Sequence, residues 1–386
     1  VPDSAAARVH RYLSRLEAFG WHGAVLLSRG GEVVLAEGYG RADHGDEGGG
    51  PRPWTAGTVS TVGSITKQFT AAAIVKLAEQ GALSLRDSLP VFFEAVPPDR
   101  RGITLHHLLT HTSGLRGVGK GDFDAVSRDE IVRLAMEAEL ATEPGAEYAY
   151  SNLGYSLLGA VVERVTGTAY EAWIREHLFR PAGMYETGYL VPGYDPRRLA
   201  TGYRGGERWG TVVGRIPGDT GPSWVLMANG GMHSTLYDIH RWVRSLMTTD
   251  RVLSPGSRET LLTPYADEGY GSWYAYGWVV DTTSRGTPVI QHDGGNGILH
   301  ADPHWFPEDG ETLTFAMSNH AEMTAIDVLD DVDAVYFGED VRMPPQVTSA
   351  EVAPERLAGL EGRYRLADGG ELEVVALGSR LEVRVS

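Results

Sequence analysis

The chain has 386 residues, a formal net charge of −17 and no cysteine. Its 42% hydrophobic and 22% charged residues are typical of a globular protein with a full core. The acidic balance disfavours binding to nucleic acid or to anionic membranes, because no basic field attracts their phosphates. The absence of cysteine excludes disulfides, thiolate catalysis and cysteine-ligated zinc.

No apolar run reaches the roughly 18 residues that a membrane helix needs, so no integral membrane segment is expected. The chain begins at Val1 rather than Met. That start fits removal of a signal peptide and trimming of the chain equally well. A secreted or extracytoplasmic location is slightly favoured over the cytoplasm, and the oligomeric state is left open.

Apolar periodicity predicts strands near both ends of the chain and helices between them. Helices are predicted at 8–20, from Ser64 to Gly81, at 128–140, after Asn152, at 236–247 and at 323–337. Strands are predicted at 23–40, as a hairpin that turns at 29–31, and at 275–280, 288–292 and 312–318.

This order of elements predicts an α/β (α+β) domain over 1–338, with a sheet built from both ends of the chain. A helical insertion at about 82–285 would fold beside it, and the groove between two such parts commonly holds a small-molecule site. Residues 339–356 read as a polar connector. The β-rich tail at 357–386 either packs onto the main body or begins a β-barrel domain that the chain does not complete.

The tetrad from Ser64 to Lys67 is the first candidate for catalysis. One helical turn separates the two side chains, so Ser64 Oγ and Lys67 Nζ can meet on a single face. A desolvated lysine can take the proton that makes a serine hydroxyl a nucleophile. The alternative is an ordinary surface pair, since roughly one S-x-x-K tetrad is expected per chain by chance.

Two further clusters supply possible partners. Tyr150 is a phenol that can transfer a proton, and Asn152 carries both a donor and an acceptor amide. The segment from His292 to Gly295 follows a predicted strand, and its backbone can line a substrate and offer an N–H group to an oxyanion. The alternatives are a buried aromatic at Tyr150 and a packed structural histidine at His292.

Three other histidines superficially suggest a metal site. His107 and His111 are four residues apart, with His106 beside them, but no glutamate completes an H-E-x-x-H motif. A structural role is therefore predicted for all three, and neither a metal nor a cofactor is expected. The glycines at 45–50 suggest a flexible loop rather than a phosphate cradle, because no G-K-[ST] follows.

The S-x-x-K, Y-x-N and H-x-G motifs begin at Ser64, Tyr150 and His292, which are 86 and 142 residues apart. In that order they resemble the serine β-lactamase and penicillin-binding-protein superfamily. The match is to the branch with class C β-lactamases, D-alanyl-D-alanine carboxypeptidases, D-aminopeptidases and esterases. The resemblance covers roughly residues 8–338. Secondary sequence marks of the family lie within it at 108–115, 143–145, 230–235 and 276–278.

This resemblance implies a β-lactamase/transpeptidase-like fold with an antiparallel sheet and an all-helical subdomain. It implies that Ser64 is the nucleophile and Lys67 the base or proton relay. Tyr150 would pass a proton to the leaving group, and Asn152 would orient the substrate and the lysine. The N–H groups of Ser64 and Gly295 would form the oxyanion hole.

His292 occupies the place where many relatives have the lysine of K-T-G. Because histidine titrates near neutrality, activity is expected to depend on pH through His292. Asp293, Gly294 and Tyr274 are the predicted substrate-binding residues. Asp293 and Gly295 replace hydroxyl residues of related motifs, and Asp293 adds a negative charge that would repel a substrate carboxylate.

The sequence therefore predicts a serine hydrolase that forms an acyl-enzyme on Ser64. The expected substrate is a small molecule or short peptide, with a D-amino-acid amide or ester favoured. A D-alanyl-D-alanine carboxypeptidase, a class C-like β-lactamase, an acyltransferase or transpeptidase, and a non-catalytic sensor or scaffold are the alternatives.

Overall fold

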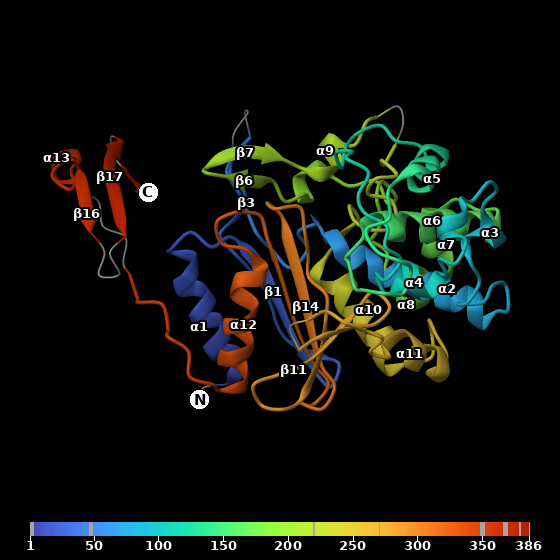
Figure 1. The fold of residues 1–386 in the computed structure, drawn as a ribbon. Helices are drawn as coiled ribbons and strands as arrows, with labels where there is room; N and C mark the ends of the chain where they lie inside the picture. Colours follow the sequence, from blue (N-terminus) through green and yellow to red (C-terminus); the bar gives the residue numbers. More distant parts are fainter. Residues whose placement is uncertain are drawn as a thin grey trace. The chain divides into compact units, whose positions relative to one another are not determined.

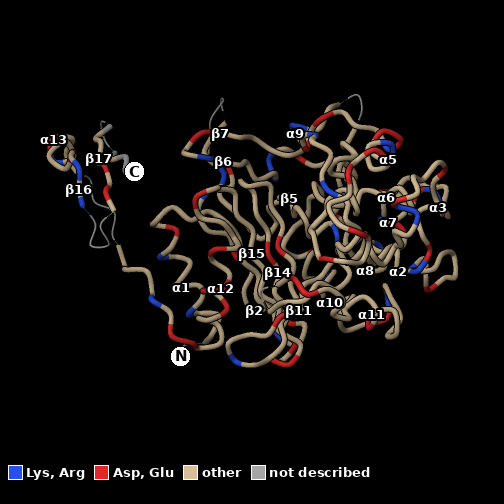
Figure 2. Tube along the Cα trace, viewed as in Figure 1, with Lys and Arg blue, Asp and Glu red and all other residues tan. Residues whose placement is uncertain are grey.

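The computed structural model describes most of the chain in two compact units, 1–343 and 344–386. The described residues are 4–45, 49–218, 221–269, 271–347, 352–365, 370–377 and 380–385. Among them, no helix is both long enough and apolar enough to cross a membrane. Figure 2 shows acidic and basic residues interspersed along the larger unit.

An antiparallel sheet forms the centre of the larger unit (Figure 1). Its strands run in the order β2 (Glu32–Tyr39), β1 (Gly23–Arg29), β15 (Thr312–Ser318), β14 (His300–Phe306), β12 (Pro288–Gln291), β11 (Val279–Thr282), β10 (Trp273–Tyr274) and β9 (Ala266–Asp267), and β13 (Gly294–Gly295) also pairs with β14. Strand β1 from the start of the chain lies beside β15, with Gly23 opposite Ser318 and Arg29 opposite Thr312. The prediction of a sheet built from both chain ends is confirmed.

Helices cover both faces of this sheet, so its central strands are buried on both sides. Helices α1 (Ala5–Glu17) and α12 (Ala325–Phe337) pack on one face, where they contact Val25 and Leu27. The alternate residues Ala24 and Leu26 face the other core, which includes α2 (Thr66–Glu79) and α10 (Leu236–Thr248). Period-2 alternation thus divides strand β1 between two cores.

Beside the sheet lies a helical region that extends the second core (Figure 1). Its helices are α3 (Leu89–Phe92), α4 (Leu105–Leu109), α5 (Arg128–Glu137), α6 (Asn152–Thr166), α7 (Tyr170–Ile174), α8 (Arg180–Ala182), α9 (Val212–Arg215) and α11 (Pro255–Leu262). Short strand pairs join these parts: β3 (Arg41–Asp43) with β4 (Arg52–Pro53), β5 (Ser60–Thr61) with β8 (His233–Ser234), and β6 (Gly202–Arg204) with β7 (Glu207–Gly210).

Several predicted elements need correction. The region 82–285 is not purely helical, because it also contributes the strands β6 to β11. The helix predicted to begin at Ser64 is preceded by a 3₁₀ turn, Gly63–Ile65, and α2 itself begins at Thr66.

Strand β14 was not predicted at all, because Pro303 argues against a central strand. The structure accommodates that proline where the edge of β14 passes from pairing with β13 to pairing with β12. Strand β13 pairs with β14 at Ala301 and His300, and β12 pairs with it at Trp305 and His304.

The smaller unit contains the helix α13 (Pro354–Ala358) and three antiparallel strands, β16 (Gly362–Arg365), β17 (Glu371–Leu377) and β18 (Arg380–Val385). The alternating pattern in the tail therefore does form strands. Residues 366–369, between β16 and β17, lie outside the described residues.

A buried charge cluster links the sheet to helix α12. His304 on β14 contacts Asp333 on α12 through Nδ1 at 2.6 Å and Asp302 through Nε2 at 3.2 Å. Burial acts to lower the pKa of His304, but the two carboxylates outweigh it and raise that pKa well above its ordinary value. His304 is therefore charged at neutral pH and compensates two buried acids.

We predict that His304→Gln lowers the free energy of unfolding by about 3–5 kcal/mol, because it leaves buried carboxylates without their cation. Urea denaturation at pH 6 measures the change. Since the folded pKa is raised, the difference from wild type should be largest below the unfolded pKa of about 6.5 and shrink as pH rises.

The control is His10→Gln, which removes an exposed ion pair with Glu37 (2.7 Å). Its cost should stay below about 1 kcal/mol. Equal costs for the two variants would contradict the role given to His304.

Candidate active site

The backbone around Ser64 is shaped by close contact with the glycines of β13. Gly63 has a φ of +48°, and a Cβ there would lie 2.3 Å from the nitrogen of Gly295. A Cβ on Gly294 would lie 2.1 Å from the Val62 carbonyl oxygen and 2.7 Å from the Ser64 nitrogen. Only glycines allow this approach, which places the Ser64 turn directly against β13.

Lys67 lies one turn further along, and none of its surface is exposed to solvent. Its Nζ is 3.1 Å from Ser64 Oγ, 2.8 Å from Asn152 Oδ1 and 2.8 Å from the Asn229 carbonyl oxygen. Burial lowers the pKa of Lys67 well below its usual value, although the nearby charge of Asp293 acts in the opposite direction. A neutral amine here can donate to the two carbonyl oxygens and keep its lone pair for the serine proton.

Tyr150 and Asn152 approach from the start of α6. Ser151 caps this helix, since its Oγ accepts a hydrogen bond from the Gly154 N–H at 3.1 Å. Tyr150 is 45% exposed as a residue, and its ring centroid lies 4.7 Å from Lys67 Nζ. Desolvation raises the Tyr150 pKa, outweighing a hydrogen bond with Ser64 that lowers it. The residue therefore keeps its phenolic proton at neutral pH.

His292 lies behind the site rather than at its surface. It is buried, its Nε2 is 2.9 Å from the Tyr274 hydroxyl, and its Nδ1 is 2.7 Å from the Asp293 carbonyl oxygen. Burial is the main cause that lowers the His292 pKa to about 4, despite the opposing charge of Asp293. A pKa lowered in this way does not favour the expected pH dependence through His292 near neutrality, which stays a prediction.

The three predicted substrate-binding residues are placed differently. Tyr274 is fully buried, and its hydroxyl contacts His292, so its role in substrate binding stays a prediction. Asp293 is exposed, and its charge acts on Lys67 and Tyr150. Gly294 is buried against the Ser64 turn.

His111, for which the sequence predicts a structural role, lies beside the catalytic groups. It is fully buried, and its Nδ1 accepts the backbone N–H of Ser151 at 3.0 Å. Its ring lies 4.3 Å from the ring of Tyr150 and 4.6 Å from that of Tyr274, centroid to centroid. His111 thus holds the turn that carries Tyr150 and Asn152, which agrees with the structural role predicted for it.

A pocket opens in front of Ser64, and the sequence did not predict the residues of one of its walls. Its lining includes Asn152, Asn229 and Asn296, together with Asp122 and Phe123 from a distant loop. Asp122 is exposed overall, but desolvation raises the pKa of its carboxyl. Among the described residues that line this pocket, none is a lysine or an arginine.

Comparison with known proteins agrees with this geometry. The beta-lactamase family model matches residues 15–324. Penicillin-binding protein 4* of Bacillus subtilis is 27% identical over 95% of this chain and 84% of its own length.

Two solved structures are also similar. A penicillin-binding protein homologue from Pyrococcus abyssi, described as octameric, has a TM-score of 0.73 at 26% identity, covering 98% of this chain and 86% of that one. A D-stereospecific amidohydrolase from Streptomyces has a TM-score of 0.69 at 25% identity, covering 87% and 99%. The chain belongs to the beta-lactamase family of serine hydrolases.

Proposed function

We propose that this protein cleaves an amide or ester bond through an acyl-enzyme on Ser64, and that its substrate is a D-amino-acid amide, ester or short peptide with a free amine or no charge. The observation that carries the proposal is the fully buried Lys67, whose Nζ contacts Ser64 Oγ. A lysine without solvent is neutral more readily than one in water, and so can accept the serine proton.

The proposed reaction follows from the positions of these groups. Ser64 Oγ attacks the carbonyl carbon as its proton passes to Lys67 Nζ, and the oxyanion is held by the N–H groups of Ser64 and Gly295. Tyr150, which keeps its proton and hydrogen-bonds Ser64, relays a proton to the leaving group. Water then attacks the acyl carbon, releases the acid and restores Ser64.

The charge around the pocket supports the choice of substrate. Asp122 lines the pocket, and Asp293 is exposed next to the catalytic groups. The described lining residues include Asp122 and no lysine or arginine, so the pocket wall offers a substrate carboxylate no cationic partner. This disfavours a D-alanyl-D-alanine carboxypeptidase or a β-lactamase. The similar D-stereospecific amidohydrolase is in line with an amide substrate.

Acyl transfer to a nucleophile other than water uses the same acyl-enzyme and is a second candidate. The partial exposure of Tyr150 is compatible with the approach of an acceptor. Product analysis with an added amine or alcohol separates transfer from hydrolysis.

A serine-directed phosphonate probe tests the enzyme itself. We expect it to label the wild type and not Ser64→Ala. No labelling of the wild type, or equal labelling of both, would favour a non-catalytic sensor or scaffold.

We predict that Lys67→Arg lowers kcat/KM by about 10²- to 10⁴-fold, because arginine does not release its proton and cannot act as the base. In the wild type, kcat/KM should rise with pH as Lys67 loses its proton, and should level off well below pH 10.5. Initial rates across a pH series measure both effects.

The matched control is Lys76→Arg, on the same helix, where Nζ donates to the Val252 carbonyl oxygen at 2.8 Å. It should retain wild-type kcat/KM. A Lys67→Arg enzyme with near wild-type activity would exclude Lys67 as the base.

Recognition of an amine gives a second prediction. Asp122→Asn should raise KM for D-alanine p-nitroanilide about tenfold, because it removes a charged partner worth about 1.5 kcal/mol. KM for the N-acetylated, uncharged analogue should stay the same. Steady-state kinetics on both substrates measure the difference.

The control for net charge is Glu308→Gln, an exposed acid that does not line the pocket. It should change neither KM. Faster release of D-alanine from acyl-D-Ala-D-Ala than of p-nitroaniline from D-alanine p-nitroanilide would refute the proposed substrate class.

A further inference from the structure

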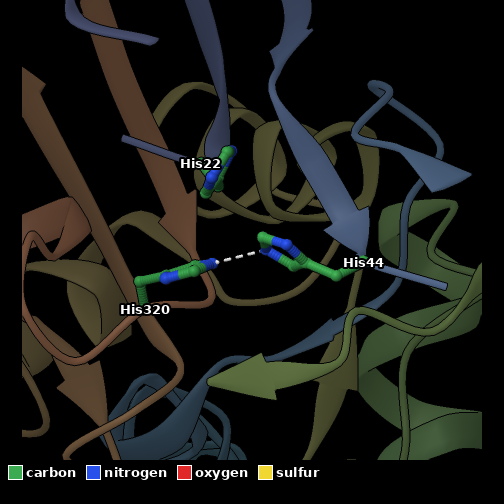
Figure 3. Close-up of side chains that lie close together, drawn as sticks. All are labelled: His22, His44 and His320. Atoms are coloured by element: carbon green, nitrogen blue, oxygen red, sulfur yellow. Dashed lines mark hydrogen bonds between the residues drawn. The ribbon is translucent and has the colours of Figure 1, made fainter. Parts of the chain in front are cut away.

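Three histidines from distant parts of the sequence meet at one end of the sheet (Figure 3). His22 directly precedes β1, His44 directly follows β3, and His320 lies two residues beyond β15. All three are partly buried. One ring nitrogen from each lies within 4.8 Å of the others.

The spacing of these nitrogens is close to that of a metal site. His44 Nε2 and His320 Nε2 are 3.1 Å apart. Zinc–nitrogen bonds of about 2.0–2.1 Å at a tetrahedral angle place two ligand nitrogens roughly 3.3–3.4 Å apart. A shift of a few tenths of an ångström would therefore admit an ion between this pair. The ring of His22 stands 4.6 Å from that of His320 and 5.2 Å from that of His44, centroid to centroid.

The charge state of the cluster suits a cation. Burial, with repulsion from neighbouring histidines, lowers the pKa of both His22 and His320 to about 4. These rings are neutral at pH 7, as a metal ligand must be, so an incoming ion displaces no positive charge from them.

The surrounding backbone holds the cluster in place. Tyr203 accepts the N–H of His44 at 2.9 Å and donates to Asp43 Oδ1 at 3.0 Å through its hydroxyl. Its ring stacks on His320 with an interplanar angle of 23°. The Asn319 N–H lies 3.4 Å from the carbonyl oxygen of His22. Ligands carried on such a frame lose little entropy when they bind.

We propose that His22, His44 and His320 bind one divalent transition-metal ion, with zinc as the preferred occupant. Three imidazoles suit zinc, cobalt or nickel, whereas magnesium and calcium prefer oxygen ligands. A tetrahedral ion would keep one position for water. The ion would join β1, β3 and β15, and so fasten the two ends of the larger unit's chain to each other.

The hydrogen bonds around the three rings indicate the order in which these ligands contribute. One of the paired His44 and His320 nitrogens carries a proton, which must move to the other nitrogen of its ring when the ion binds. For His320, that Nδ1 lies 4.0 Å from Glu322 Oε2, so the carboxylate would have to move closer to accept the N–H.

His22 Nδ1 accepts the Arg41 N–H at 3.1 Å, so its proton is on Nε2. Its coordination requires the ring to turn or to exchange that proton. His44 and His320 are therefore the principal ligands, and His22 completes the site.

Titration calorimetry with zinc sulfate tests the proposal on the full chain, without a polyhistidine tag and after removal of metal by EDTA. We expect one ion per chain and a rise in Tm on binding, because the ion binds only the folded protein. Bound Co²⁺ should give the visible absorption of a tetrahedral site.

Substitution of each ligand should weaken binding in the stated order. His44→Ala and His320→Ala should lower zinc affinity on the order of 100-fold, and His22→Ala about tenfold. His44→Gln, a substitution closer in size to histidine, should weaken binding as His44→Ala does. Circular dichroism checks that each variant keeps the fold of the wild type. Hydrolysis rates are measured separately, on enzyme from which metal has been removed. A failure of zinc binding can then be told apart from a failure of the proposed hydrolase activity.

Two controls locate the site. His10→Ala removes an exposed histidine, and Asp330→Asn alters the other group of potential ligands, His304 with Asp330 and Asp333. Both should bind zinc as the wild type does. Failure of the wild type to bind zinc, or unchanged affinity in both His44→Ala and His320→Ala, would overturn the proposal.

Discussion

The burial of one lysine is the constraint on which the site depends. Lys67 has no exposed surface, and its Nζ is surrounded by Ser64, Asn152 and the Asn229 carbonyl. To exclude water there, α2 must be packed on all sides, and 11 of its 14 residues are buried. Its buried residues accordingly lie around its whole circumference rather than along one stripe, although several of them are polar. Gly277 completes this packing, since a Cβ there would lie 2.7 Å from the Lys67 carbonyl oxygen.

The same burial explains how acidic groups can stand close to the site without disabling it. Asp293 favours a charged lysine, whereas desolvation disfavours it, and desolvation is the larger effect. For Tyr150, desolvation and the charge of Asp293 both raise the pKa, so both favour the protonated phenol. A carboxylate at the rim can therefore select for an amine in the substrate, while the buried groups keep the protonation states that acyl transfer needs.

How much the sequence predicted depends on how local each feature is. The sequence predicts Ser64 and Lys67 as a pair because one helical turn joins them, and it predicts the sheet because β1 and β15 each carry a run of apolar residues. Strand β14 was missed because Pro303 breaks the usual pattern. Asp122 carries no local signal of its role, since its position in the Ser64 pocket exists only after loops far apart in the chain have folded together.

The histidine cluster depends on that same long-range pairing but uses a different part of the sheet. His22 and His320 are brought together because Gly23 pairs with Ser318, a register fixed by the alternation of residues between two cores. The catalytic groups depend instead on β13 and the starts of α2 and α6. An ion at the cluster would resist separation of β1 from β15 without contacting Ser64. Stability and chemistry can thus be altered separately in this fold, although one sheet supports both.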